Sequence, residues 1–168
     1  MQITARIAGH GEVPLLVDLM EEFYAESGYA LDREWARASF RHFLSDPSLG
    51  RAWVLFDGAE PAGYVVLTVR FAMEYGGLEG FIDDLYVRPA YRRHGIARHA
   101  LNTLFEECRR WGIRAVQVEV GRGNAAANAL YASFNLRPRD DDRVTLVTTL
   151  HDRPEEPEGS GKGGGVGC

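Results

Sequence analysis

Four arginines and one glycine stand close together in this 168-residue chain, between an apolar run and a helical one. The stretch is Val87–Arg98, with Gly95 where the helical pattern begins. A strand that enters a helix through such a turn leaves backbone N–H groups without helical acceptors, at the positive end of the helix dipole. Because arginine adds forked donors that match phosphate oxygens, the stretch predicts a pyrophosphate site. The alternative is an ordinary basic surface loop.

Two adjacent acids, Asp83 and Asp84, lie in the apolar run just before this stretch. Side chains alternate along a strand, so the two carboxylates should face opposite sides of a sheet and cannot both line one pocket. Paired acids could also bind a metal ion, but no histidine or cysteine cluster has ligand spacing, and we expect no metal. The alternative for each acid is a solvated charge on a strand.

The apolar periodicity predicts the elements that position these residues, in the order β-α-α-β-β-β-α-β-α-β. The expected strands are residues 2–7, 51–57, 62–71, 80–87, 115–120 and 143–150, and the expected helices are 13–24, 32–45, 96–111 and 124–134. In the second helix Asp32 is the expected N-cap, with Trp35, Ala38 and Phe43 inward. The order indicates an α/β (α+β) fold with a mostly antiparallel first half and a central βαβ unit.

One folded domain is expected over residues 1–151, followed by a disordered tail at 152–168 that is rich in glycine, glutamate and proline. The net charge of −5 gives no reason to expect nucleic acid as a partner. Two cysteines make no disulfide framework, and no apolar run is long enough to span a membrane. These features predict a cytoplasmic protein with no membrane partner.

Two motifs carry a resemblance to a known family. The first is Arg92-Arg93-His94-Gly95-Ile96-Ala97, and the second, about 30 residues later, contains Asn124, Ala127, Leu130 and Tyr131. In this order the motifs resemble the acetyl-CoA motif and the following motif of the Gcn5-related N-acetyltransferase (GNAT) superfamily, over about Ile3 to Leu150. Asn135-Leu136 stands where the family often has Gly-Phe, and asparagine tolerates the positive φ that this turn requires.

The resemblance implies the single-domain acyl-CoA N-acyltransferase fold, with a mixed sheet of about six to seven strands and about four helices. It also implies acetyl-CoA as co-substrate, no metal, and a possible homodimer. The cofactor contacts carried over are Leu85, Tyr86, Val87, Arg92, Arg93, His94, Gly95, Ile96, Ala97, Arg98, Asn124, Asn128 and Tyr131. The pantetheine arm would run beside the strand that ends at Val87 and pair with its backbone.

Catalytic roles follow from the same resemblance. Tyr131 would protonate the departing thiolate, although a tyrosine in a helical pattern can also be a core residue. Similarity to polyamine and thialysine acetyltransferases makes Asp83 the preferred general base and Asp84 the second acid. The acceptor site would use acidic and aromatic side chains that suit a cationic amine, namely Tyr24, Glu26, Tyr29 and Glu79.

The sequence therefore predicts an N-acetyltransferase that moves the acetyl group of acetyl-CoA to a primary amine. The expected acceptor is a small cationic or amino-acid-like molecule, and the amine would attack directly in a ternary complex. Two alternatives remain open: an enzyme that acetylates protein N-termini or lysines, and an acyl-CoA-binding regulatory module without catalytic activity.

Overall fold

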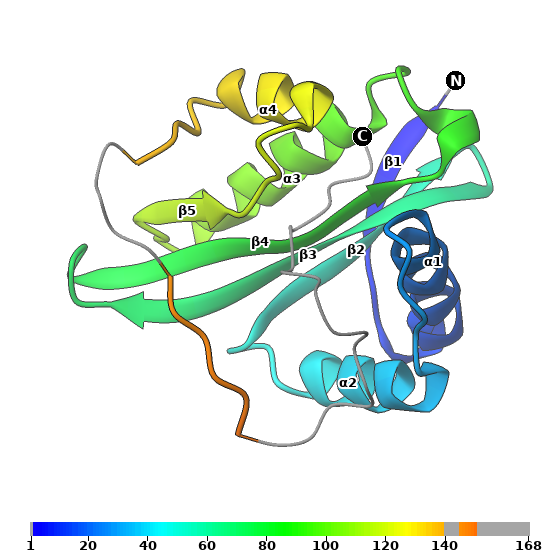
Figure 1. The fold of residues 1–168 in the computed structure, drawn as a ribbon, viewed down its shortest axis with the longest axis horizontal. Helices are drawn as coiled ribbons and strands as arrows, with labels where there is room; N and C mark the ends of the chain where they lie inside the picture. Colours follow the sequence, from blue (N-terminus) through cyan, green and yellow to red (C-terminus); the bar gives the residue numbers. More distant parts are fainter. Residues whose placement is uncertain (1, 140–144, 151–168) are drawn as a thin grey trace.

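The computed structural model describes residues 2–139 and 145–150 as a twisted five-stranded sheet with helices on both faces (Figure 1). The strands are β1 (Ile3–Ile7), β2 (Gly50–Asp57), β3 (Glu60–Ala72), β4 (Gly77–Val87) and β5 (Ala115–Val118). The α-helices are α1 (Val13–Glu26), α2 (Arg33–Ser45), α3 (Ile96–Arg110) and α4 (Ala125–Ala132). Short 3-10 turns, η1 (His10–Glu12) and η2 (Pro89–Tyr91), precede α1 and follow β4. In the described ranges no helix is long and apolar enough to cross a bilayer.

The strands lie in chain order, β1-β2-β3-β4-β5. The first four pair antiparallel, and β5 returns through α3 to pair parallel with β4, which confirms the predicted βαβ unit. The β4–β5 pairing runs only from Glu79–Ala115 to Ile82–Val118. The rest of β4, up to Val87, is paired with β3 alone, so the sheet is open beside the last residues of β4.

Two apolar cores lie on opposite faces of the sheet. The α3/α4 face packs Leu85 and Val87 of β4 against Leu101 and Leu104 of α3. The α1/α2 face packs Tyr64 and Tyr86 against Phe23 of α1 and Phe40 of α2. Because side chains alternate along β4, the two cores fix which face each candidate residue reaches.

Helix α2 begins as predicted but is rotated relative to the prediction. The Asp32 carboxylate accepts a hydrogen bond from the Trp35 N–H (3.0 Å), which confirms the N-cap. The buried residues are Ala36 and Phe40, four positions apart on one stripe. Trp35 and Ala38 are exposed, so their predicted inward orientation is wrong.

The predicted last strand is also wrong in the part that the structure describes. Residues 145–150 form no strand, and Leu146, Val147 and Leu150 are more than four-fifths exposed. A β-prone segment becomes a strand only where a neighbouring strand pairs with it. The described sheet therefore has five strands rather than six or seven, while residues 143–144 and the predicted tail 152–168 lie outside the described residues.

Candidate active site

The turn before α3 combines two residues with left-handed backbone conformation. Gly95, the N-cap of α3, has φ 84°, and Arg93 has φ 66°. The first main-chain hydrogen bond of α3 is donated by the His99 N–H to the Gly95 carbonyl (2.9 Å). The N–H groups of Ile96, Ala97 and Arg98 therefore have no helical acceptor and are exposed at the positive end of α3. This geometry is compatible with the anion site that the sequence predicts.

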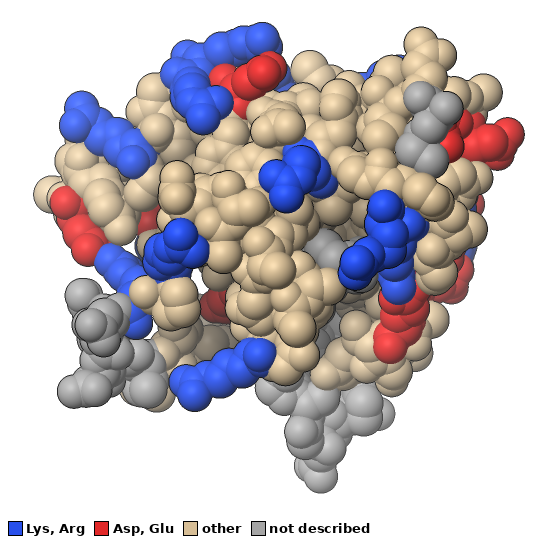
Figure 2. Space-filling view, turned by 90° about the horizontal axis from the view of Figure 1, so that it is seen from above, with Lys and Arg blue, Asp and Glu red and all other residues tan. Residues whose placement is uncertain are grey.

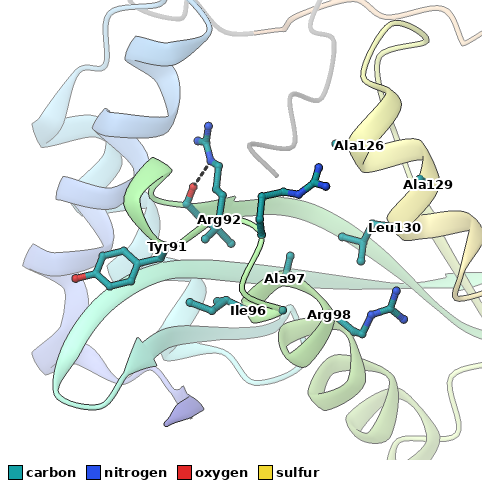
Figure 3. A pocket seen from close by; sticks show the side chains of 11 residues that line it. Tyr91, Arg92, Ile96, Ala97, Arg98, Ala126, Ala129 and Leu130 are labelled. Atoms are coloured by element: carbon teal, nitrogen blue, oxygen red, sulfur yellow. Dashed lines mark hydrogen bonds between the residues drawn. The ribbon is translucent and has the colours of Figure 1, made fainter. Parts of the chain in front are cut away.

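A pocket of about 320 Å³ opens at this turn, between the end of β4, the start of α3 and α4 (Figure 3). Its lining consists of Val87, Tyr91, Arg92, Arg93, Gly95, Ile96, Ala97, Arg98, Ala126, Ala129 and Leu130. Two alanines on α4 keep the entrance wide. Figure 2, which looks onto the face that carries α3 and α4, shows basic side chains more widely spread than acidic ones. The pocket therefore suits an anionic ligand.

The backbone of β4 offers a second contact surface next to this pocket. The Arg88 N–H donates to the Ala62 carbonyl (2.8 Å), so in the antiparallel β3–β4 ladder alternate residues bond to β3. The polar backbone groups of Leu85 and Val87 consequently point the other way, into the opening left by β5. An extended arm that carries amides could pair there as an added strand. Tyr86 is separated from the other cofactor candidates, because its backbone faces β3 and its side chain lies on the α1/α2 face.

The second motif builds the start of α4. The Asn124 side chain accepts from the Ala127 N–H (3.0 Å), and the Asn128 side chain donates to the Gly121 and Asn124 carbonyls (3.0 and 2.7 Å). Tyr131, 2% exposed, belongs to the core on the α3/α4 face. After α4, Asn135 has φ 63°, so the positive φ expected at that turn is confirmed. The two asparagines hold the helix that carries Tyr131.

The acidic pair lies where the sheet opens. Val66 pairs with Asp84 and Leu67 with Ile82, so Asp83 is the extra residue of a β-bulge. Asp83 is exposed, whereas Asp84 accepts a hydrogen bond from the buried Tyr64 hydroxyl (2.9 Å). Burial raises the pKa of Tyr64 well above its usual value, and Asp84 and then Asp83 add to the effect. Asp84 therefore contacts this phenol directly, whereas Asp83 affects it only through its charge.

Sequence reasoning missed Tyr64. The residue stands in an apolar run where a tyrosine is unremarkable, and only the β3–β4 register places it beside Asp84, 20 positions later. A tyrosine within a buried strand that is predicted to pair with an acidic strand is the signal that could have indicated it.

The candidate acceptor residues fall into two groups. Tyr24, Glu26 and Tyr29 lie together at the end of α1, where the Tyr29 N–H donates to the Tyr24 carbonyl (2.9 Å). Glu79 lies apart from them, because it is buried where β4 pairs on both sides. Its carboxylate accepts hydrogen bonds from Arg70 (2.6 Å) and Gln117. Among residues 2–139 and 145–150, no group of three or more acidic, histidine or cysteine side chains could hold a metal ion.

A mixed sheet that opens beside a glycine turn and an anion site is the arrangement expected of an acyl-CoA N-acyltransferase. The profile of the acetyltransferase (GNAT) family matches residues 15–135, and the chain belongs to that family. The resemblance carried by the two motifs is thereby confirmed.

Two curated relatives match less than half of the chain. One is the [ribosomal protein bS18]-alanine N-acetyltransferase of Escherichia coli K12, 34% identical over 42% of this chain and 48% of the relative. The other is the thialysine N-epsilon-acetyltransferase of Caenorhabditis elegans, 35% identical over 47% of this chain and 49% of the relative. The chain thus spans about half the length of the curated relatives it matches.

Solved structures match almost the whole domain. An integron cassette protein from the mobile metagenome of the Cole Harbour salt marsh is 40% identical, with a TM-score of 0.79 over 89% of this chain and 91% of that one. A predicted acetyltransferase from Clostridium acetobutylicum, solved with acetyl-CoA, is 17% identical, with a TM-score of 0.73 over 87% and 96% of the two chains. At that identity the likeness establishes the fold alone.

Proposed function

We propose that this protein transfers the acetyl group of acetyl-CoA to the primary amine of a small cationic or amino-acid-like acceptor, by direct attack in a ternary complex. One observation carries the proposal. The anion site at Gly95 and the open edge of β4 are adjacent, so a ligand with a pyrophosphate and an extended amide arm can use both.

Each part of acetyl-CoA has a matching partner in this chain. The N–H groups of Ile96, Ala97 and Arg98, with the exposed side chain of Arg93, would hold the pyrophosphate. The backbone edge at Leu85 and Val87 would guide the pantetheine arm towards the bulge. The acetyl group supplied by the co-substrate would then lie where the sheet opens.

The chemistry requires the acceptor nitrogen to lose two protons and the CoA sulfur to gain one. A lysine-like amine, with a pKa of about 10.4, is protonated at neutral pH and cannot attack a carbonyl carbon. Asp83, directly or through water, would take that proton, and the free amine would form the new C–N bond. The C–S bond would then break as the Tyr131 hydroxyl protonates the leaving sulfur, while the nitrogen gives up its second proton to water. The Tyr131 oxygen would regain a proton from solvent, so one proton is released for each acetyl group transferred.

Tyr131 and the second acid, Asp84, lie on opposite faces of the sheet. Tyr131 lies on the α3/α4 face, whereas Asp84 lies with Tyr64 on the α1/α2 face. The described β4–β5 pairing ends at Ile82 and Val118, immediately before Asp83, and an opening between the two faces is expected there. This arrangement lets the co-substrate enter from one face and the acceptor from the other.

The nature of the acceptor is supported by acidic side chains of β4 and aromatic side chains at the end of α1. Asp83, Asp84, Tyr24 and Tyr29 are acidic or aromatic and favour a cation. The thialysine acetyltransferase to which the chain is similar bears the name of such a substrate. The other relative is named for an alanine of ribosomal protein bS18, and a protein α-amine is therefore the second candidate.

Incubation with radiolabelled acetyl-CoA separates these candidates. One arm contains polyamines and lysine analogues, and the other contains peptides that begin with alanine. We expect label on the small amines. Label only on the peptides would mean that protein N-termini are the acceptors. Binding of acetyl-CoA without acetylation of any amine would favour a non-catalytic binding module.

A further inference from the structure

Two similar ion pairs join the end of α1 to the segment that follows β4. Arg88 donates to both Glu22 oxygens (2.8 and 2.7 Å), and Arg92 donates to both Glu26 oxygens (2.7 and 2.6 Å). The glutamates are one helical turn apart on α1, and the arginines are also four positions apart. Arg88 uses Nε and Nη2 for its two bonds, whereas Arg92 uses Nη2 for both, and the surroundings of the two pairs also differ.

Arg92 is tied to the cofactor side of the site by two further bonds. Its Nε donates to the Val87 carbonyl (2.7 Å), the dashed line in Figure 3, and its backbone N–H donates to the Pro89 carbonyl (3.3 Å). These donors are therefore engaged before any phosphate arrives. Arg88, by contrast, bonds to the Pro61 carbonyl (2.7 Å) and is absent from the pocket lining.

Glu26 is tied to the acceptor side. Its carboxylate also accepts from the Tyr86 hydroxyl (3.2 Å), and the Arg92 guanidinium lies 5.7 Å from the centre of the Tyr86 ring. The same ring stacks on Phe23 of α1 at 5.5 Å. Arg92 and Glu26 thus connect the strand edge at Val87 with the point where α1 ends and the loop that carries Tyr29 begins.

We propose that Arg92 and Glu26 are positioning residues for the acceptor, and that the Arg92 side chain is not a phosphate ligand. The pair fixes the end of α1, and with it residues 27–32, against the backbone that would guide the pantetheine arm. The acceptor part of this inference rests on the proposed function. It reassigns Arg92 from cofactor binding and Glu26 from direct substrate contact.

The test compares Arg92→Ala, Glu26→Gln and the double variant for acceptor KM, kcat and acetyl-CoA Kd. Loss of a charged hydrogen-bonded pair should raise the acceptor KM about tenfold, while acetyl-CoA Kd changes by less than about twofold. The double variant should be no worse than either single one, because both substitutions break one interaction. Arg92→Lys, which keeps the charge but loses the fork, should restore only part of the acceptor affinity.

Glu22→Gln is the matched control, because it breaks the neighbouring arginine–glutamate pair between α1 and the segment after β4. It should lower the melting temperature as much as Glu26→Gln does, yet leave the acceptor KM unchanged. Equal kinetic effects of Glu22→Gln and Glu26→Gln would mean that the Arg92–Glu26 pair contributes only to stability, and would overturn the proposal. A tenfold rise in acetyl-CoA Kd for Arg92→Ala would make Arg92 a phosphate ligand and overturn the proposal.

Hydrogen exchange tests the positioning role independently of turnover. Arg92→Ala and Glu26→Gln should speed amide exchange in residues 27–32 more than Glu22→Gln does. Absence of that difference would overturn the proposal even in a fully active enzyme. Faster exchange together with no transfer to any amine would reject the proposed function and leave the positioning of this loop standing.

Discussion

Asp83 and Asp84 are neighbours in sequence with different environments. Asp83 is the exposed residue of the bulge, whereas Asp84 is hydrogen-bonded to Tyr64. We expect Asp83→Asn to lower kcat about 100-fold or more, because it removes the general base, and to leave acetyl-CoA binding intact. Steady-state kinetics with saturating acetyl-CoA provides the measurement.

Asp84→Asn is the matched variant for this prediction. The asparagine oxygen can still accept from Tyr64, so the change should act mainly on the acceptor KM. The reverse order, with the larger kcat loss at Asp84, would assign the base to Asp84 and contradict the preferred role of Asp83.

Tyr131 is tested by removal of its hydroxyl alone. Tyr131→Phe should lower kcat about 100-fold, since the thiolate then leaves without its acid, and the acetyl-CoA Kd should stay constant. Because Tyr131 is 2% exposed, the melting temperature of the variant must be recorded beside kcat. An unchanged kcat in a folded variant would show that water supplies the proton.

Residues whose role is local could be predicted from the sequence. Gly95 was expected at the start of a helix, Asn135 at positive φ and Asp32 at an N-cap, because each role depends on a few neighbouring positions. Tyr64 and the Arg92–Glu26 pair could not be predicted, because their partners are 20 and 66 positions away. Such pairs are set by strand register and helix docking.

At the scale of elements, strand β4 has the central place. The alternation of its side chains and the strand itself are evident from sequence, but the bulge at Asp83 and the early end of β5 are not. Both depend on how three strands align, and together they open the sheet beside Leu85 and Val87. The site is therefore a property of the sheet as much as of the motif.

Helix α3 is held to the sheet at its far end by an ion pair. Glu107, 6% exposed, accepts from Arg51 of β2, whose guanidinium lies 4.7 Å from the Trp111 ring. Glu107→Ala should lower the free energy of unfolding by about 3 kcal/mol, because it leaves Arg51 half-buried without its partner. Urea titration measures this loss.

The exposed neighbour Glu106 offers a control on the same helix. Glu106→Ala should change the free energy of unfolding by less than about 0.5 kcal/mol. The acetyl-CoA Kd should be unchanged in both variants, because the pair is remote from the Gly95 turn. A comparable loss in Glu106→Ala would contradict the importance assigned to the Arg51 contact.

At the scale of the whole molecule, the stability of the domain should fall at high pH. Burial, and then Glu26, raises the pKa of Tyr86 to about 12. An unfolded tyrosine ionises near pH 10, so above about pH 10 the unfolded state loses protons that the folded state keeps, and the folded state is progressively disfavoured. Tyr86→Phe should make this decline less steep in urea titrations between about pH 9 and about pH 11.5. An equal slope would contradict the cause given.

The helices and strands were more predictable than the number of strands in the sheet. Nine predicted segments correspond to the observed helices and strands, because each carries its own apolar pattern. The last predicted strand failed, because its existence depends on pairing with an edge that the described residues 145–150 do not reach. Patterns within a segment thus predict elements, while pairing between segments decides the sheet.

The central claim is that the Gly95 turn binds acetyl-CoA. Calorimetric titration of acetyl-CoA into the wild type, Gly95→Asp and Gly112→Asp tests it most directly. Both glycines have positive φ (84° and 67°) at opposite ends of α3, and at both an added Cβ would meet no protein atom within 4 Å. The backbone strain and added charge are therefore similar, and only Gly95 lines the pocket. The account predicts that Gly95→Asp abolishes binding and Gly112→Asp retains it; undiminished affinity in Gly95→Asp would contradict it.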